Sequence, residues 1–189
     1  MNPATVLLLP GWQNSGPDHW QSQWQTEHGY LRVEQHDWQR PLRGDWIARL
    51  EEVLLRCNEP VVLVAHSLGC ILVAAWAAHS RQTHRVQAAL LVAPGDVERE
   101  EMRPVLTSWS PISLQNLPFK SILAGSRNDP LCSFARAQAF ANAWNSDFVD
   151  CGGLGHINAD SGLGLWPQGH ALLRRIAEDG PCGQLPQSH

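Results

Sequence analysis

Short apolar runs alternate with longer segments of helical periodicity along most of the chain. Runs rich in Val and Leu are typical of buried parallel strands, and the longer segments predict helices between them. The six predicted strands are Thr5–Leu9, Leu31–His36, Val61–Ala65, Ala88–Ala93, Phe119–Ala124 and Phe148–Cys151. The predicted helices are Asp18–His28, Asp45–Cys57, Leu68–Ser80, Ser133–Trp144 and Gln168–Ala177. This rhythm predicts an α/β fold with about six mostly parallel strands and helices on both faces.

Polar residues refine the predicted element boundaries. Asp45 and Ser133 are expected to cap their helices, and Asp18 to lie in the first turn of its helix. The connection Pro94–Pro118 has no clear apolar period, and loops of this length often border a functional site. Residues 180–189 are polar and rich in Gly and Pro, so we predict a single domain over 1–179 followed by a disordered tail.

Length, charge and cysteine content exclude several classes of protein. A chain of 189 residues corresponds to about one domain. With 14 basic and 18 acidic residues, its net charge of −4 leaves no basic excess to neutralise nucleic acid. The apolar runs are shorter than the ~20 residues of a membrane span, and the N-terminus lacks signal-peptide features. Five cysteines form neither a CxxC pair nor a disulfide framework. We therefore predict a cytoplasmic protein without nucleic-acid or membrane partners.

One serine lies in the sequence context of a catalytic nucleophile. The buried strand Val61–Ala65 leads through His66 to Ser67, and an alanine-rich helix follows directly. Ala65 and Gly69 flank the serine as in the G-x-S-x-G motif, with alanine in place of the first glycine. Small residues are needed there because the sharp strand-to-helix turn brings the two elements close together. The alternative is that Ser67 only caps the helix.

An acid and a base follow later strands in a suitable order. Asp129 comes just after the strand Phe119–Ala124, and His156 ends the glycine-rich segment after the last strand. Taken singly, Asp129 is also explained as a turn residue and His156 as a loop histidine. The order Ser67, Asp129, His156 is that of the α/β-hydrolase triad, so together the three residues predict nucleophilic catalysis.

The first strand is followed by a loop that suits a second part of the same site. An acyl-transfer intermediate needs amide donors for its negative charge, and the amides of Leu68 and Trp12 are the candidates. Gly11 permits an unusual backbone turn before Trp12. We expect Gly11, Trp12 and Trp109 to contact substrate. A plain loop leading into a capped helix is the alternative for this segment.

These motifs together resemble a known family. The chain up to about Ile176 is similar to the small serine hydrolases of the α/β-hydrolase superfamily related to retinoblastoma-binding protein 9. The similarity is carried by Pro10-Gly11-Trp12, Asp18-His19-Trp20 and Trp24, Val64–Gly69, Leu91–Pro94, Ser126–Pro130, Gly155–Asn158, Ser161-Gly162 and Trp166-Pro167. The resemblance implies a compact hydrolase fold without a lid, with Ser67 as nucleophile, Asp129 as orienting acid and His156 as base.

A second motif suggests a protein partner. Leu55–Glu59 matches the L-x-C-x-E pattern that binds pocket proteins. Leu55 and Cys57 end a predicted amphipathic helix, where at least one of them is expected to face the core. We therefore interpret this segment as helix packing rather than as a pocket-protein site.

Two functions remain after motif comparison. H-E-x-x-H, Walker A and G-x-G-x-x-G patterns are missing from the sequence, so we predict neither a metal nor a cofactor. The first hypothesis is a serine hydrolase that cleaves an ester or related acyl bond of a small substrate; thioesters and amides stay open. The second is a binding or scaffold protein on a hydrolase fold with a vestigial triad. No stretch is long enough for a folded cap, so the loops Pro94–Pro118 and around Trp12 should wall a shallow, open pocket.

Overall fold

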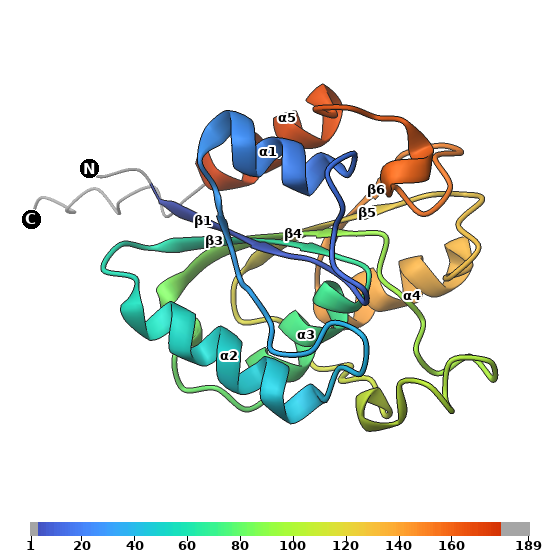
Figure 1. Ribbon diagram of the computed structural model, residues 1–189, viewed down its shortest axis with the longest axis horizontal. Helices are drawn as coiled ribbons and strands as arrows, with labels where there is room; N and C mark the ends of the chain where they lie inside the picture. The colour runs from blue at the N-terminus through green and yellow to red at the C-terminus, as the bar shows by residue number, and fades with distance from the viewer. Residues whose placement is uncertain (1–3, 179–189) are drawn as a thin grey trace, which may run out of the picture.

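The computed structural model describes residues 4–178, and its centre is a parallel β-sheet (Figure 1). Within this range the sheet has six strands in the order β2-β1-β3-β4-β5-β6, and every neighbouring pair is parallel. The strands are β1 (Thr5–Leu9), β2 (Leu31–Arg32), β3 (Val61–His66), β4 (Val86–Val92), β5 (Lys120–Gly125) and β6 (Asp147–Asp150). The predicted α/β class is confirmed.

Helices cover both faces of this sheet. They are α1 (Trp20–His28), α2 (Arg43–Arg56), α3 (Leu68–Ala77), α4 (Phe134–Trp144) and α5 (Pro167–Glu178). Helices α1 and α5 lie on one face, and α2, α3 and α4 lie on the other (Figure 1). The predicted tail 180–189 and the predicted domain end at 179 lie outside the described residues.

Alternation along the central strands explains why both faces are covered. In β1, Leu7 and Leu9 belong to the apolar core under α2, α3 and α4, whereas Leu8 belongs to the core under α1 and α5. Successive side chains of a strand point to opposite faces, so a strand that is apolar throughout needs a helix layer on each side. All six residues of β3 are buried in this way, which places the residue after it, Ser67, at the carboxyl edge of the sheet.

Three polar side chains were predicted to lie at helix starts. The predictions for Asp18 and Asp45 are wrong, and the prediction for Ser133 is confirmed. Helix α1 begins at Trp20, and its cap is His19, whose side chain accepts a hydrogen bond from the Gln21 amide; Asp18 therefore precedes the helix. Helix α2 begins at Arg43, so Asp45 lies in its first turn instead of capping it. Ser133 caps α4 as predicted, accepting from the Arg136 amide.

The edge strand β2 is much shorter than the predicted Leu31–His36. The Val33 amide still donates to the Leu8 carbonyl at 2.9 Å, but the chain then leaves the sheet. Instead, the Glu34 carbonyl accepts a hydrogen bond from Nε of Arg49 on α2 at 2.9 Å. An edge strand has a neighbouring strand on one side only. Beyond Val33, a side chain of α2 takes the place of the hydrogen bonds that β1 would have made with the longer predicted strand.

The loop between β4 and β5 is held against the body of the protein by several hydrogen bonds. Within it, the short 3₁₀ turn η2 (Thr107–Trp109) carries a fully buried Trp109, whose indole donates to the Pro41 carbonyl at 2.9 Å. Near its start, Glu98 accepts from Nη2 of Arg136 on α4 at 2.6 Å. The segment is therefore fixed to the rest of the protein by its side chains.

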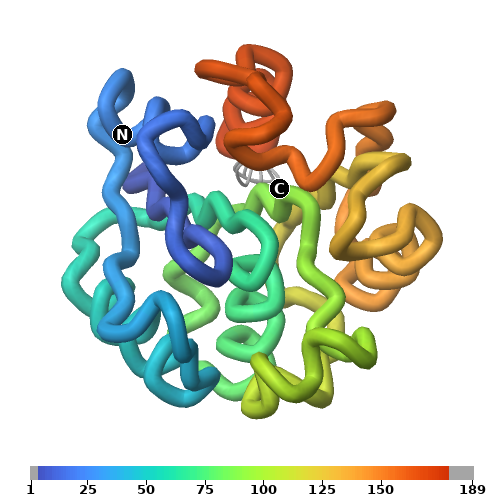
Figure 2. The backbone as a smooth tube through the Cα atoms, turned by 45° about the vertical axis from the view of Figure 1, so that its right-hand side comes forward, coloured from blue at the N-terminus to red at the C-terminus, as the bar shows by residue number. Residues whose placement is uncertain are grey.

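The loops at the carboxyl edge of the sheet face one another. Figure 2, turned toward this edge, shows the segments that follow β1 (blue), β4 (green) and β6 (orange to red) around a common centre. Residues placed at the ends of parallel strands meet at such an edge, which is where ligands bind in open α/β sheets.

The segment Leu55–Glu59 lies at the end of α2. Leu55 is 52% exposed, whereas Cys57 packs against the core under α2, and its thiol donates to the Val53 carbonyl. The prediction that at least one of the two side chains faces the core is confirmed. Between residues 4 and 178, no helix has the length and apolar character that crossing a membrane requires.

Candidate active site

Ser67 lies at a strained turn between β3 and α3. Its backbone has φ 54° and ψ −119°, a region that a non-glycine residue occupies only when its surroundings hold it there. The Ser67 amide donates to the Val92 carbonyl at 3.0 Å, which ties the turn to β4. Its side chain makes no capping hydrogen bond to α3, so the interpretation of Ser67 as only a helix cap is wrong.

The close packing expected around this turn is present. A Cβ atom at Gly69 would lie 2.3 Å from the Leu9 carbonyl oxygen, so only glycine fits at that position. Ala65 on the other side is fully buried. These contacts place α3 directly against β1 and aim the Ser67 hydroxyl out of the sheet edge.

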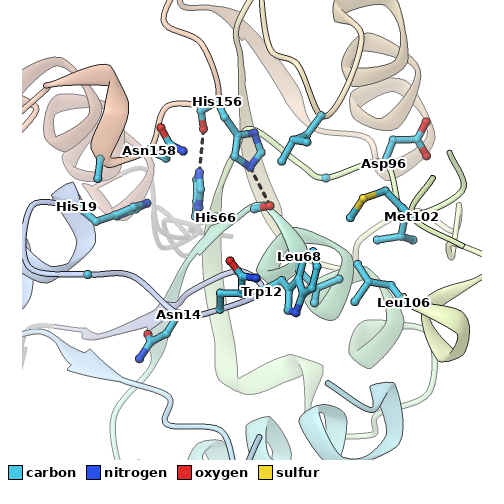
Figure 3. A pocket seen from close by; sticks show the side chains of 18 residues that line it. Trp12, Asn14, His19, His66, Leu68, Asp96, Met102, Leu106, His156 and Asn158 are labelled. Carbon is cyan, nitrogen blue, oxygen red and sulfur yellow. Dashed lines mark hydrogen bonds between the residues drawn. The ribbon is translucent and has the colours of Figure 1, made fainter. Parts of the chain in front are cut away.

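His156 connects Ser67 to Asp129. Its Nε2 lies 2.9 Å from Ser67 Oγ (Figure 3). Its Nδ1 lies 2.9 Å from both Asp129 oxygens. The side chains of His156 and Asp129 are only 8% and 3% exposed. A carboxylate can only accept, so Nδ1 carries the proton and the Nε2 lone pair faces the serine hydroxyl.

The loop that carries His156 is fixed by side chains of the loop after β5. Ser126 Oγ accepts from the Leu154 amide at 2.9 Å, and Asn128 Oδ1 accepts from the Gly155 amide at 2.8 Å. The His156 carbonyl accepts from His66 Nε2 at 2.9 Å. Asp129 and His156 are therefore held by two loops that hydrogen bonds join to each other. Ser126 and Asn128 are close to Asp129 in sequence, but their role depends on pairing between β5 and β6.

The loop after β1 lies directly against the serine turn. A Cβ atom at Gly11 would be 2.8 Å from Ser67 Cβ and 3.3 Å from the Leu68 amide nitrogen. Gln13 and Asn14 both have positive φ, and the Asn14 amide donates to the Gly11 carbonyl, which closes a tight turn. Gly11 is not among the positive-φ residues, so glycine is needed here for the close approach to Ser67 and not for the unusual backbone turn that the sequence predicted.

A cavity of about 390 Å³ opens beside Ser67, within the size range of small-molecule sites. One side of it is largely apolar and the other is polar, and Asp96 lies beside Met102 on the largely apolar side (Figure 3). The apolar side is formed by Trp12, Val97, Met102, Leu106 and Leu131, and the polar side by Asn14, His19, His66 and Asn158. Gly95 contributes open space, because a Cβ atom there would lie 3.2 Å from Ser67 Oγ. The Trp12 loop and the segment after β4 are both walls of this cavity, as expected.

Trp109 does not reach the cavity, which corrects the expectation that it contacts substrate. Its side chain is 0% exposed and packs edge-on against Trp46, with ring centroids 5.3 Å apart. Met102 and Leu106, from the same segment, line the cavity in its place. Trp12 does line the cavity, and its indole donates to the Gln39 carbonyl.

Two further histidines, His19 and His66, line the cavity beside His156, and neither was among the predicted site residues. His66 lies between the rings of His19 and His156, with centroid distances of 4.7 and 4.9 Å. Burial lowers the pKa of the His66 imidazole well below its ordinary range. Burial, followed by the positive charge of Arg32, lowers the pKa of His19 to about 3. Both rings are therefore neutral at neutral pH.

These lowered pKa values predict a loss of stability in acid. In the unfolded chain each histidine takes up a proton near pH 6.5, whereas the folded rings of His19 and His66 stay neutral. The free energy of unfolding should therefore fall as the pH drops below about 6.5, by about 2 kcal/mol per histidine between pH 7 and 5. In His66→Gln the amide replaces the Nε2 donor without titrating, so urea unfolding should show a smaller loss over this range.

An exposed histidine supplies the matched control. His84 lies on the short 3₁₀ turn η1 (Thr83–Arg85), and His84→Gln should leave the pH dependence of unfolding as in the parent protein. If His66→Gln loses as much stability between pH 7 and 5 as the parent does, His66 is not held neutral by burial.

Other nucleophiles and metal ligands are not grouped in this way. Among residues 4–178, no three His, Cys, Asp or Glu side chains are arranged to hold a metal ion. The four cysteines in that range are free thiols. Burial raises the pKa of Cys132 to about 12 and that of Cys151 to about 11, and it raises the pKa of Cys70 as well. These thiols are protonated at neutral pH and therefore poor nucleophiles.

The fold and the site together define a class of protein. A parallel sheet carries a serine at a strained turn after β3, an aspartate after β5 and a histidine after β6. This is the arrangement of the α/β-hydrolase fold. The model of the serine hydrolase family matches residues 6–175, and the chain belongs to that family.

Solved structures agree with this assignment. A YdeN-like hydrolase from Pectobacterium atrosepticum is 32% identical, with a TM-score of 0.82 over 93% of this chain and 91% of its own. The ydeN gene product of B. subtilis is 17% identical, with a TM-score of 0.74 over 93% of this chain and 100% of its own. Est1E from Butyrivibrio proteoclasticus, solved with ferulic acid bound, shares the fold at 12% identity, with a TM-score of 0.70 over 93% of this chain and 88% of its own. A search of the curated proteins found no match.

Proposed function

We propose that this serine hydrolase cleaves an ester or related acyl bond of a small substrate through an acyl-enzyme intermediate. The observation that carries the proposal is the hydrogen-bonded chain from Ser67 through His156 to Asp129 at the wall of a cavity. The fold alone would also suit a binding protein. The chain of hydrogen bonds, however, is what removal of the proton from a nucleophilic serine requires.

The proposed reaction begins at Ser67. Its Oγ attacks the substrate carbonyl carbon while His156 Nε2 takes the hydroxyl proton. Asp129 stabilises the imidazolium that forms, through the hydrogen bond at Nδ1. His156 then gives the proton to the leaving group, and the acyl group stays on Ser67. Water next attacks the acyl-enzyme with His156 again as base, which releases the acid and restores the serine.

Two backbone amides are proposed to hold the developing oxyanion. The Leu68 amide is the first of α3, where the positive end of the helix favours negative charge. The contact of Gly11 with the serine turn supports Trp12 as the second donor, because Trp12 is the next residue in the chain and also lines the cavity. Removing one such donor typically costs about 10²–10³ in rate.

The cavity favours small substrates. Its volume of about 390 Å³ is near the lower end of the usual range for ligand sites. The apolar side, with Met102 and Leu106, suits a short hydrocarbon or aromatic acyl group. The esterases among the structural neighbours support esters as the first substrates to test.

A fluorophosphonate probe tests the proposal directly. The protein should form one covalent adduct, located by mass spectrometry on the peptide that contains Ser67, and should hydrolyse p-nitrophenyl acetate. Preincubation with the probe should abolish the hydrolysis in proportion to labelling. Failure of both labelling and hydrolysis in folded protein would overturn the proposal in favour of a binding protein.

A further inference from the structure

One side chain on the polar side of the cavity offers a hydrogen-bond donor that a ligand can reach. Asn158 lines the cavity and is partly exposed. Its Oδ1 accepts from the Asp160 amide at 3.2 Å and so caps the short 3₁₀ turn η3 (Ala159–Ser161). This bond makes Nδ2 the donating end of the amide. Among residues 4–178, Nδ2 has no hydrogen-bond partner, and it is not one of the buried unpaired atoms, so it is open to solvent.

The position of Asn158 assigns this donor to one arm of a substrate. Asn158 follows His156 by two residues and belongs to the same loop. Figure 3 shows Met102 and Leu106 on one side of His156. Asn158 lies on the other side of His156 (Figure 3). An acyl group against the apolar side leaves the polar side to the leaving group, which takes its proton from His156.

The ligand group that fits this donor is an uncharged oxygen. Among the described residues, no lysine or arginine lines the cavity. Burial holds the neighbouring rings of His19 and His66 neutral by lowering the pKa of each. The carboxylate of Asp160 lines a second hollow together with Asn158. A ligand carboxylate at Asn158 would therefore lose its hydration without gaining an ionic partner and would be repelled by Asp160.

We propose that Asn158 forms the leaving-group subsite of this hydrolase, where its Nδ2–H donates to an ether, hydroxyl or carbonyl oxygen in the alcohol portion of an ester. The inference rests on the proposed function, because it assigns one arm of the substrate in the same cavity. The bond between the carbonyl carbon and the alcohol oxygen breaks, and the alcohol leaves with the proton that His156 took from Ser67. The hydrogen bond to Asn158 keeps the departing oxygen close to that proton donor. The predicted substrates are esters of short alcohols that carry a second oxygen.

Two pairs of esters test this assignment. In the alcohol pair, 2-methoxyethyl acetate is compared with n-butyl acetate, which has a methylene in place of the ether oxygen of the leaving group. In the acyl pair, p-nitrophenyl 3-methoxypropanoate is compared with p-nitrophenyl pentanoate, which makes the same exchange in the acyl group. Loss of the Asn158 donor should change the ratio of kcat/KM, ether ester over hydrocarbon ester, in the alcohol pair alone.

Two variants separate the donor from the helix cap. In Asn158→Ser the hydroxyl keeps the cap on η3, because serine caps about as well as asparagine, but the side chain is too short to replace Nδ2. In Asn158→Ala both the cap and the donor are lost. The ratio for the alcohol pair should fall about 3- to 10-fold in both variants, the usual range for one lost hydrogen bond. Intrinsic differences in ester reactivity cancel because each ratio is compared between proteins. Ser133→Ala, which removes the cap of α4 outside the cavity, should leave both ratios unchanged.

Three results overturn the inference: an alcohol-pair ratio that is the same in the parent protein and Asn158→Ser, a ratio that falls only in Asn158→Ala, or an equal fall in the acyl pair. Each of them leaves the proposed function intact, because the reference esters are still hydrolysed. A protein that hydrolyses no ester and does not react with the fluorophosphonate probe instead contradicts the proposed function.

Ligand-observed NMR with the Ser67→Ala protein decides the inference where neither alkyl acetate is hydrolysed. Stronger binding of 2-methoxyethyl acetate than of n-butyl acetate, abolished when Asn158→Ser is added, supports it. Relative binding that does not change when Asn158→Ser is added overturns it.

Discussion

Replacing Ser67 by alanine should lower kcat for p-nitrophenyl acetate by about 10⁴-fold or more, close to the loss seen when serine hydrolases lose their nucleophile. The reason is that Ser67 Oγ attacks the substrate carbonyl carbon. In the alanine variant only a water molecule could attack, and the protein does not hold that water at the same position. The change should cost little stability, because Ser67 Oγ caps no helix and its one hydrogen bond is to His156 Nε2. Steady-state kinetics and thermal unfolding of both proteins measure the two effects.

Ser146→Ala is the matched control for this substitution. Ser146 precedes β6 at the opposite edge of the sheet, where its hydroxyl bonds to that of Ser121 at 2.6 Å. This variant should lose about 1 kcal/mol of stability and keep its kcat. A Ser67→Ala protein that hydrolyses the ester as fast as the Ser146→Ala protein would show that another group is the nucleophile.

Asp129→Asn should lower kcat by about 10³–10⁴-fold while leaving KM nearly unchanged. Asp129 accepts from the Leu131 amide through Oδ1 at 2.8 Å, so asparagine will keep its oxygen there. Its NH₂ group then occupies the position of Oδ2, 2.9 Å from His156 Nδ1, so the Nδ1–H loses one of its two acceptors, the negative charge is gone, and a second donor faces it. The ring escapes this conflict by moving its proton to Nε2, and it then has no lone pair for the Ser67 hydroxyl.

Asp150→Asn tests whether any lost carboxylate has this effect. Asp150 is at the end of β6 and pairs with Arg127 at the surface, at 2.6 Å. Its amide variant should keep kcat within about twofold of the parent value, as surface substitutions away from a site usually change little. If Asp129→Asn is no slower than Asp150→Asn, the carboxylate of Asp129 does not orient His156.

Much of the fold could be predicted because the buried strands are encoded locally. Strand β1 matches its predicted bounds, and β3 extends only one residue beyond its predicted end. Both are apolar throughout, as expected of strands covered on two faces. The edge strand β2 was overestimated: beyond Val33, the Glu34 carbonyl bonds to Arg49 of α2 instead of to β1, and the local sequence does not show this long-range contact.

The catalytic candidates could be predicted because each follows a strand end. Parallel strands bring their carboxyl ends to one edge, so chain order alone placed Ser67, Asp129 and His156 together. The rest of the site depends on tertiary packing. His19 follows the first loop by only a few positions, and nothing local distinguishes its ring from that of an ordinary helix cap.

Trp109 shows the limit of inference from residue type. A tryptophan in a long loop suits either a ligand pocket or the core, since both accept its large apolar ring. The outcome is decided by an acceptor for its indole N–H, which here is the Pro41 carbonyl, a residue 68 positions earlier in the chain. Such a partner is not visible in the local pattern.

The anchored segment between β4 and β5 lines the cavity but contains none of the proposed catalytic residues. The three proposed catalytic residues come from other loops, whereas Met102 and Leu106 contribute only apolar side chains to the cavity wall. Trp109 and the Glu98–Arg136 pair hold the segment from outside the cavity. Substitutions at Met102 and Leu106 are therefore free to reshape the acyl side without disturbing proton transfer. Related enzymes with the same triad can diverge in substrate through this one stretch of chain, which makes it the natural starting point for redesign.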